Sequence, residues 1–224
     1  MSRMTGQKRP PGRPPRISRD EIVAAAHRIV AEEGVEKLTM RRLAREVGST
    51  PMALYHHVSD RDGLLLLLLE DYAVRAPRPD LPADPRERVI AVATAMRDAL
   101  AEIPWIMDVL TSGRLFGRSA LWFNEQIIAA ALDCGLTPED AVRAYRAIWH
   151  YTAGQIIVTS RERAARDRAR AATGTTYRER VFGTLDPDEH PALARVADRW
   201  EELSVRDDYA AGLRALVDGL VRRA

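Results

Sequence analysis

The 224-residue sequence has a single cysteine, Cys134, and no apolar run longer than the six residues of Leu64–Leu69. A lone cysteine cannot close a disulfide within the chain, which excludes the small scaffolds that depend on such bonds. A membrane-spanning helix needs about 20 apolar residues, so we expect no membrane partner. Residues 1–19 lack the apolar stretch of a signal peptide, and we therefore expect a cytoplasmic protein.

Acidic residues are missing from residues 1–19, which carry six lysines and arginines. The net charge of the whole chain is only +2, so the excess of positive charge lies in this segment. Basic side chains that neutralise phosphates release condensed counterions, and nucleic acid is therefore the expected partner of such an arm. We predict a basic disordered arm over 1–17; a solubilising tail or a cloning remnant is the alternative interpretation.

Strand patterns are also missing, because no five-residue alternation of apolar and polar residues bounded by turn residues occurs. Apolar residues instead recur at spacings of three and four, which predicts an all-α chain. Four prolines near residue 80 interrupt the helical pattern, because proline lacks a backbone donor. The predicted organisation is a helical domain over 18–73, a Pro-rich linker over 74–85, and a larger helical domain over 86–224 with a long loop at 172–190.

Helix-capping signals divide the first domain into four short helices. A capping box at Ser18 and Glu21 starts the first helix, and Pro51 suits the first position of the third because that position needs no N–H. The predicted caps are Ser18, Thr39, Thr50 and Ser59, and the predicted ends of the first three helices are Gly34, Gly48 and Val58.

The second and third helices, joined by a short turn at Gly48, match a helix-turn-helix, whose second helix lies in the major groove of DNA. We predict Pro51–Val58 as this recognition helix, with Leu54 and Val58 facing the core. The outward side chains, which could reach phosphates and base edges, are Met52, Ala53, Tyr55, His56 and His57. A generic three-helix core is the alternative interpretation.

Three segments of this domain can be compared with known families: Leu38-Thr39-Met40-Arg41-Arg42-Leu43-Ala44-Arg45-Glu46-Val47-Gly48, Ala53-Leu54-Tyr55-His56-His57-Val58 and Asp60-Arg61-Asp62-Gly63-Leu64-Leu65. By these segments the chain resembles the TetR family of bacterial transcriptional repressors. The resemblance implies an N-terminal helix-turn-helix domain and a larger C-terminal helical domain that binds an effector and forms the dimer.

The same resemblance implies roles in binding double-stranded DNA. Tyr55 and Arg61 would contact phosphates, Arg41 would reach a base or a phosphate, and Pro51 stands where related repressors carry a polar reader. The DNA-binding set on the helices is Arg41, Thr50, Pro51, Met52, Ala53, Tyr55, His56, His57 and Arg61.

The arm contains Pro11-Gly12-Arg13-Pro14, which resembles the Gly-Arg-Pro core of AT-hooks that enter the minor groove. We predict that Arg13 and Arg16 contact DNA, either inside a minor groove or loosely along the phosphates.

In the C-terminal domain, a Gly113-Arg114-Leu115-Phe116-Gly117 turn and the closing segment 209–220 resemble the tetracycline-repressor branch of the family. The resemblance implies a homodimer through two helices near 138–165 and 205–222. Small residues on the last helix would permit a close approach of the partner: Ala211, Gly212, Ala215 and Gly219. Its apolar stripe either faces the partner or covers the core of its own subunit: Leu213, Leu216, Val217 and Leu220.

Large aromatic side chains, including all four tryptophans, gather in this domain. Small-molecule sites are usually apolar cavities with a few polar groups, so we predict an apolar or aromatic effector. The predicted ligand set is Trp105, Phe116, Trp122, Phe123, Gln126, Tyr145, Trp149 and His150, with ordinary core packing as the alternative for each aromatic residue.

Metal ligands are sparse. No histidine occurs between Val58 and Trp149, so the metal chelate that the tetracycline-binding branch holds with a histidine is not expected. The five histidines include no pair spaced four apart and no cysteine partner at metal spacing. We predict no metal site and no cofactor.

The predicted function is a ligand-responsive transcriptional regulator, a repressor that binds a near-palindromic operator as a homodimer and is released by an effector. An architectural DNA binder or a protein-interaction module without an effector is the alternative. We expect no enzyme, because the sequence contains no G-x-S-x-G, P-loop or G-x-G-x-x-G motif.

Overall fold

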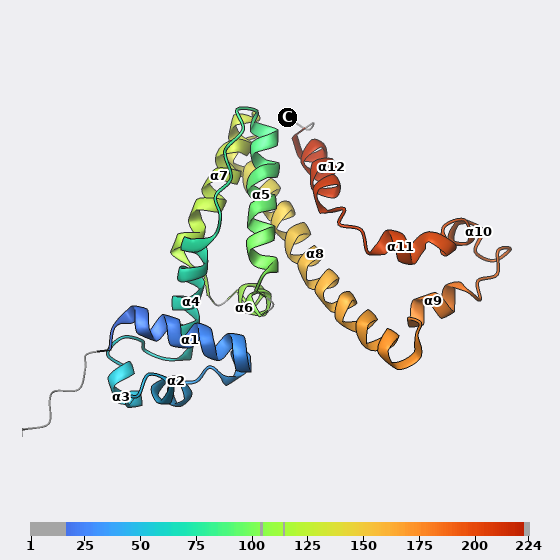
Figure 1. Cartoon of the computed structure of the whole chain (residues 1–224). Helices are drawn as coiled ribbons and strands as arrows, with labels where there is room; N and C mark the ends of the chain where they lie inside the picture. The colour runs from blue at the N-terminus through green and yellow to red at the C-terminus, as the bar shows by residue number, and fades with distance from the viewer. Residues whose placement is uncertain (1–16, 104, 114, 222–224) are drawn as a thin grey trace, which may run out of the picture. The chain divides into compact units, whose positions relative to one another are not determined.

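The computed structural model describes residues 17–103, 105–113 and 115–221. These residues form helices joined by turns and loops, and no strand occurs among them (Figure 1). The predicted all-α fold class is confirmed. The chain divides into two compact units, of which the first ends at Asp71 and the second begins at Tyr72.

The first unit holds the predicted short helices. Ser18 and Glu21 form the predicted capping box, and the hydroxyls of Thr39 and Thr50 accept backbone N–H bonds at the starts of the next two helices. The elements are α1 (Arg19–Glu33), the 3-10 turn η1 (Val35–Lys37), α2 (Met40–Glu46), α3 (Pro51–Leu54) and α4 (Arg61–Arg75), which continues into the second unit.

Two predicted boundaries are wrong. The third helix ends at Leu54 instead of Val58, because the N–H of His57 donates to the Leu54 carbonyl at 2.8 Å and tightens the last turn. The fourth helix is capped by Asp60 instead of Ser59, since Asp60 Oδ1 accepts the N–H of Gly63 at 2.8 Å. The predicted recognition helix Pro51–Val58 is therefore one helical turn followed by a hydrogen-bonded turn.

One apolar stripe from each helix builds the core of the first unit. Each of its central side chains is at most 1% exposed: Ile22, Ile29, Leu43, Leu54, Leu64 and Leu68. Full burial of one such side chain contributes about 1.5–3 kcal/mol, so this core holds α2 and α3 in place. His27 adds a polar tie from α1 to α4, with its Nε2 atom 2.6 Å from Asp71 Oδ2.

The second unit packs four helices around one core, drawn from α5, α7, α8 and α12 (Figure 1). Tyr209 of α12 is 2% exposed, and its hydroxyl lies 2.8 Å from Thr152 Oγ1 and donates to the Ala93 carbonyl at 3.2 Å. These bonds fix α12 on α5 and α8. The elements are α5 (Pro85–Ala101), α6 (Ile106–Thr111), η2 (Arg118–Ala120), α7 (Leu121–Asp133), α8 (Pro138–Thr173), α9 (Tyr177–Phe182), α10 (Pro191–Ala194), η3 (Ala197–Arg199), α11 (Trp200–Ser204) and α12 (Tyr209–Val221).

The bounds of three segments differ from the prediction. Helix α8 continues past the predicted end at 165 to Thr173, and Gly174 with φ 75° ends it. Helix α9 lies inside the predicted loop 172–190, because Thr176 and Glu179 form a capping box that starts it. Helix α12 begins at Tyr209 instead of 205 and is described to Val221.

The apolar stripe of α12 serves its own subunit in part. Leu213 and Val217 are at most 2% exposed and belong to the core of the second unit. The alternative that this stripe covers its own core is therefore confirmed for these two residues. Leu216 and Leu220 are half-buried against the same core.

Candidate nucleic-acid interface and effector region

The turn between α2 and α3 is built by backbone bonds and one glycine. Gly48 has φ 64°, a left-handed conformation that other residues adopt only with strain. The N–H of Ser49 then donates to the Ala44 carbonyl at 2.8 Å, and Thr50 Oγ1 accepts the N–H of Ala53 at 3.3 Å. The chain therefore leaves α2 and enters α3 in a fixed direction.

The predicted separation of inward and outward side chains is present in the segment 51–58. Leu54 and Val58 are 0% and 5% exposed, whereas Met52 and Tyr55 are 72% and 50% exposed. His56 and His57 are also exposed, and Pro51 and Ala53 are half-buried. The predicted DNA-contacting side chains of this segment are thus exposed or half-buried, whereas its two predicted core side chains are buried.

Arg61 anchors the start of α4. Its Nε donates to the Leu38 carbonyl at 3.3 Å and its Nη2 to the Val35 carbonyl at 3.1 Å. A guanidinium has five N–H donors, so these two bonds orient the side chain and leave donors for a phosphate. Arg13 and Arg16 of the predicted arm lie outside the described residues.

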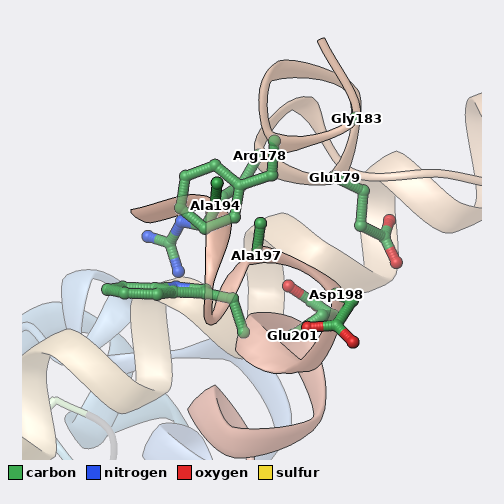
Figure 2. A pocket seen from close by; sticks show the side chains of 9 residues that line it. Arg178, Glu179, Gly183, Ala194, Ala197, Asp198 and Glu201 are labelled. Carbon is green, nitrogen blue, oxygen red and sulfur yellow. The ribbon is translucent and has the colours of Figure 1, made fainter. Parts of the chain in front are cut away.

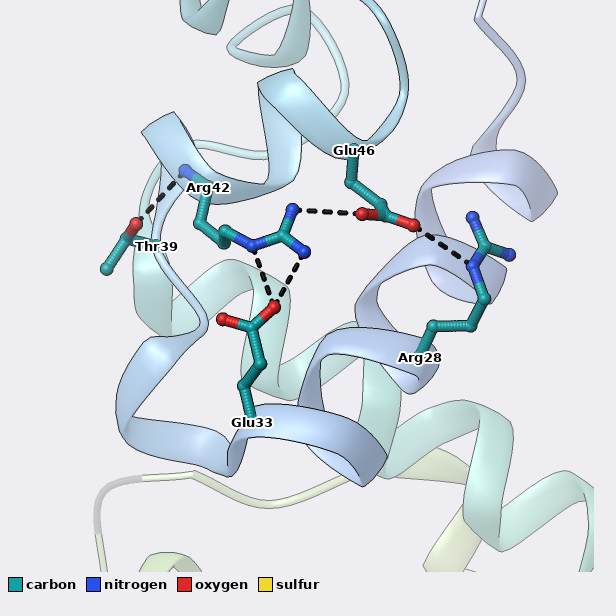
Figure 3. Close-up of polar contacts among 5 residues, drawn as sticks. All are labelled: Arg28, Glu33, Thr39, Arg42 and Glu46. Atoms are coloured by element: carbon teal, nitrogen blue, oxygen red, sulfur yellow. Dashed lines mark hydrogen bonds and ion pairs between the residues drawn. The ribbon is translucent and has the colours of Figure 1, made fainter.

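Arg42 of α2 and Arg28 of α1 are paired with carboxylates (Figure 3). Arg42 lies 2.6 Å from Glu33 Oε1 through Nη2 and 2.9 Å from Glu46 Oε2 through Nη1, and Arg28 Nε lies 3.1 Å from Glu46 Oε1. The hydrogen bond to Glu33, followed by that to Glu46, raises the pKa of Arg42 above its ordinary value. This network ties α2 to α1.

A hollow of about 640 Å³ opens on α2 and on the turn that leads into α3. Arg41 and Arg45 are exposed, and within the described part of the chain no ion pair neutralises either of them. Arg45 was not among the residues predicted to bind DNA, although its spacing of four from Arg41 places the two on the same side of α2. The lining residues are Thr39, Arg41, Ala44, Arg45, Ser49 and Pro51.

The structure brings together half of the predicted ligand set. Trp122, Phe123, Tyr145 and Trp149 all pack in or against the core of the second unit. The rings of Trp122 and Phe123 meet edge to face at 5.0 Å, and burial raises the pKa of Tyr145 above its ordinary value.

The other predicted ligand residues are placed differently. Gln126 is half-buried on α7, and Trp105 packs its ring edge to face with Tyr72 at 6.1 Å. Phe116 is 51% exposed and His150 is exposed as well, so neither belongs to the packed aromatic cluster.

A second hollow, of about 430 Å³, lies among α9, α11 and the segment between them (Figure 2). Phe182 and Trp200 meet edge to face at 5.1 Å on its wall, and Arg178, Glu179 and Asp198 add charged groups. None of these residues was in the predicted ligand set, because the contacts depend on how the helices after α8 fold back.

The described residues offer neither a metal-binding cluster nor a membrane-spanning helix. They contain no group of three or more histidine, cysteine or acidic side chains arranged to hold a metal ion. Their helices also include none with the length and apolar character required to cross a membrane.

Both units match known protein families. Residues 22–68 match the model of the bacterial regulatory proteins of the tetR family, and residues 78–223 match that of the tetracyclin repressor-like C-terminal domain. The HTH-type transcriptional repressor DrrR1 of Streptomyces coeruleorubidus is 30% identical over 229 residues, which cover 96% of this chain and 82% of that protein.

Two further proteins are similar over nearly the whole chain. The class A tetracycline repressor from transposon 1721 of Escherichia coli is 26% identical, covering 93% of this chain and 92% of its own. The structure of the transcriptional regulator SCO7222 from Streptomyces coelicolor aligns with a TM-score of 0.74 at 26% identity, covering 92% of this chain and 98% of that one.

Proposed function

This chain belongs to the TetR family of bacterial regulatory proteins and is a DNA-binding transcriptional regulator; we propose that it is a repressor that binds a near-palindromic operator as a homodimer and leaves it when a small-molecule effector binds. Regulators of this family are typically not enzymes. The observation that carries the proposal is the exposed segment 51–57, which rests on the buried side chains of Leu54 and Val58.

The segment 51–57 would enter the major groove. Met52 and Ala53 suit contact with thymine methyl groups, and His56 and His57 carry ring nitrogens that can bond to base edges or phosphates. The hydroxyl of Tyr55 and the guanidinium of Arg61 would bind backbone phosphates and thereby fix the register of the segment on the duplex. Arg41 and Thr50 would complete this surface from the starts of α2 and α3.

A homodimer would present this segment twice. We propose that α8 and α12 pair with the same helices of a second copy, as the predicted helices near 138–165 and 205–222. The exposed side of α12 carries little side-chain bulk at Ala211, Ala215 and Gly219, which favours close packing of another helix. Two segments one helical turn of DNA apart, about 34 Å, would then contact successive major grooves.

The aromatic cluster of the second unit is the proposed effector region. Trp122, Tyr145 and Trp149 are half-buried against the core and offer apolar ring surface. An effector can release DNA only by the difference between its affinities for the two conformations of the protein. Because α4 begins in the first unit and ends in the second, we propose that a shift of α4 carries this difference.

A selection of duplexes from a random library by the full-length protein tests the proposal. A repressor of the proposed kind enriches one inverted repeat and protects two half-sites in a footprint. An architectural DNA binder would enrich no repeat and would protect the duplex uniformly. A thermal-shift screen of small molecules, followed by release of the selected duplex, tests the effector.

A further inference from the structure

We infer that Arg45, acting with Arg41, binds a DNA backbone phosphate in the hollow on α2. The inference rests on the proposed function and adds to it a residue that the helix-turn-helix pattern does not single out. Both arginines line the hollow, together with the hydroxyl-bearing residues Thr39 and Ser49. Guanidinium and hydroxyl groups are the donors that proteins use to bind phosphate oxygens.

The distribution of charge on α2 supports this assignment. Arg42, on the side that faces α1, is bound by Glu33 and Glu46, and Glu46 also pairs with Arg28. Arg41 and Arg45 are four residues apart and exposed, and no carboxylate among the described residues pairs with them. Like charges at this spacing repel each other on a helix, and a bound anion would offset this repulsion.

The position of the hollow favours a polymer phosphate over a free anion. Pro51, the first residue of the proposed groove-entering segment, also lines it. A backbone that passes the hollow would therefore continue along the exposed face of Met52 and Tyr55. Free inorganic phosphate is the other source of the same chemistry, and a competition with it distinguishes the two.

The test compares the full-length protein with Arg45→Ala on a duplex that the wild type selects from a random library. Both are titrated across about 50–200 mM salt, where the logarithm of the binding constant falls by about 0.9 per phosphate contact for each tenfold rise in salt. Loss of one contact in each subunit of a dimer lowers this slope by about 1.8. The affinity for a scrambled duplex falls by the same factor as that for the selected duplex.

Arg28→Ala is the matched control, since Arg28 is also an exposed arginine of the first unit but is already paired with Glu46. Its salt slope stays at the wild-type value. The double variant of Arg41→Ala and Arg45→Ala weakens binding by less than the product of the two single effects, because both residues act on one phosphate. Thermal melting of each variant shows that the fold is retained.

Three results would overturn the inference. An unchanged salt slope for Arg45→Ala would show that Arg45 contacts no phosphate. A loss of affinity confined to the selected duplex would show that Arg45 contacts a base. Displacement of DNA by millimolar inorganic phosphate in the wild type but not in Arg45→Ala makes the hollow a free-anion site. A wild type that binds all duplexes equally instead contradicts the proposed function, while the slope of Arg45→Ala still decides the inference.

Discussion

The ring of Tyr151 on α8 fills the space in which Gly212 on α12 would carry a side chain: a Cβ atom on Gly212 would lie 2.9 Å from Tyr151 Cζ. Tyr151 also stacks on Tyr209 with ring centroids 5.3 Å apart and donates its hydroxyl to the Tyr209 carbonyl at 3.2 Å. A Cβ at position 212 would therefore force the Tyr151 ring to shift from this packing.

We predict that Gly212→Ala destabilises the fold by about 1–3 kcal/mol, the usual cost of overpacking a core. The free energy of unfolding from a denaturant titration measures it. Gly219→Ala is the control on the same helix, because a Cβ there meets no atom within 4 Å. Equal stability of the two variants would show that Tyr151 does not constrain position 212.

Ionisation of the Tyr209 hydroxyl should lower the free energy of unfolding at high pH. Burial raises the pKa of Tyr209 from 10.0 to about 12. The unfolded chain loses this proton first, so the stability that the protonated Tyr209 contributes is fully present below pH 10 and is lost as pH rises through about 12. The expected slope is about 1.4 kcal/mol per pH unit.

Tyr209→Phe has no such proton, so its free energy of unfolding should decline less between pH 10 and 12 than that of the wild type. Denaturant titrations at a series of pH values measure the difference. Parallel curves for the two proteins would contradict the assignment of this decline to Tyr209.

Tyr55→Phe should weaken operator binding by roughly tenfold or more for each subunit of the dimer, because a hydrogen bond to a charged group contributes about 1.5–3 kcal/mol. Tyr55 is 50% exposed, so the fold should not change. Tyr177→Phe, at a tyrosine that is 75% exposed on α9, is the matched control and should bind the operator like the wild type. Gel-shift titrations of the selected operator measure the affinities of the two variants. Equal affinities would contradict a phosphate contact by Tyr55.

Trp149→Ala should abolish the response to an effector found by thermal-shift screening more than it lowers the melting temperature. Trp149→Phe keeps an aromatic ring and should retain part of the response, which separates the effector role from a packing role. Arg146→Ala is the control, since Arg146 is exposed on the same helix and was not in the predicted ligand set. A larger change in melting temperature than in effector response would assign Trp149 to the core.

Local signals predicted the first unit well. The caps at Ser18, Thr39 and Thr50 depend on residues three positions away, and such short-range bonds are visible in a sequence. The cap of α4 was misplaced because Ser59 and Asp60 are adjacent and both are good caps. Which of them accepts the bond depends on how the turn before α4 is packed.

Contacts between distant residues could not be predicted. Tyr151 and Gly212 meet only because α8 and α12 pack together, and neither residue type indicates the other in the sequence. Arg42 and Arg45 look alike as sequence, yet among the described residues Glu33 and Glu46 pair with Arg42 and not with Arg45. The candidate phosphate site therefore emerged from the folded chain.

Binding of the operator by a homodimer is tested by a footprint of the full-length protein on its selected operator, combined with the mass of the complex from analytical ultracentrifugation. The expected result is two subunits on one inverted repeat, with protected half-sites centred about one helical turn apart. A single subunit on the duplex, or protection without a repeat, would contradict it.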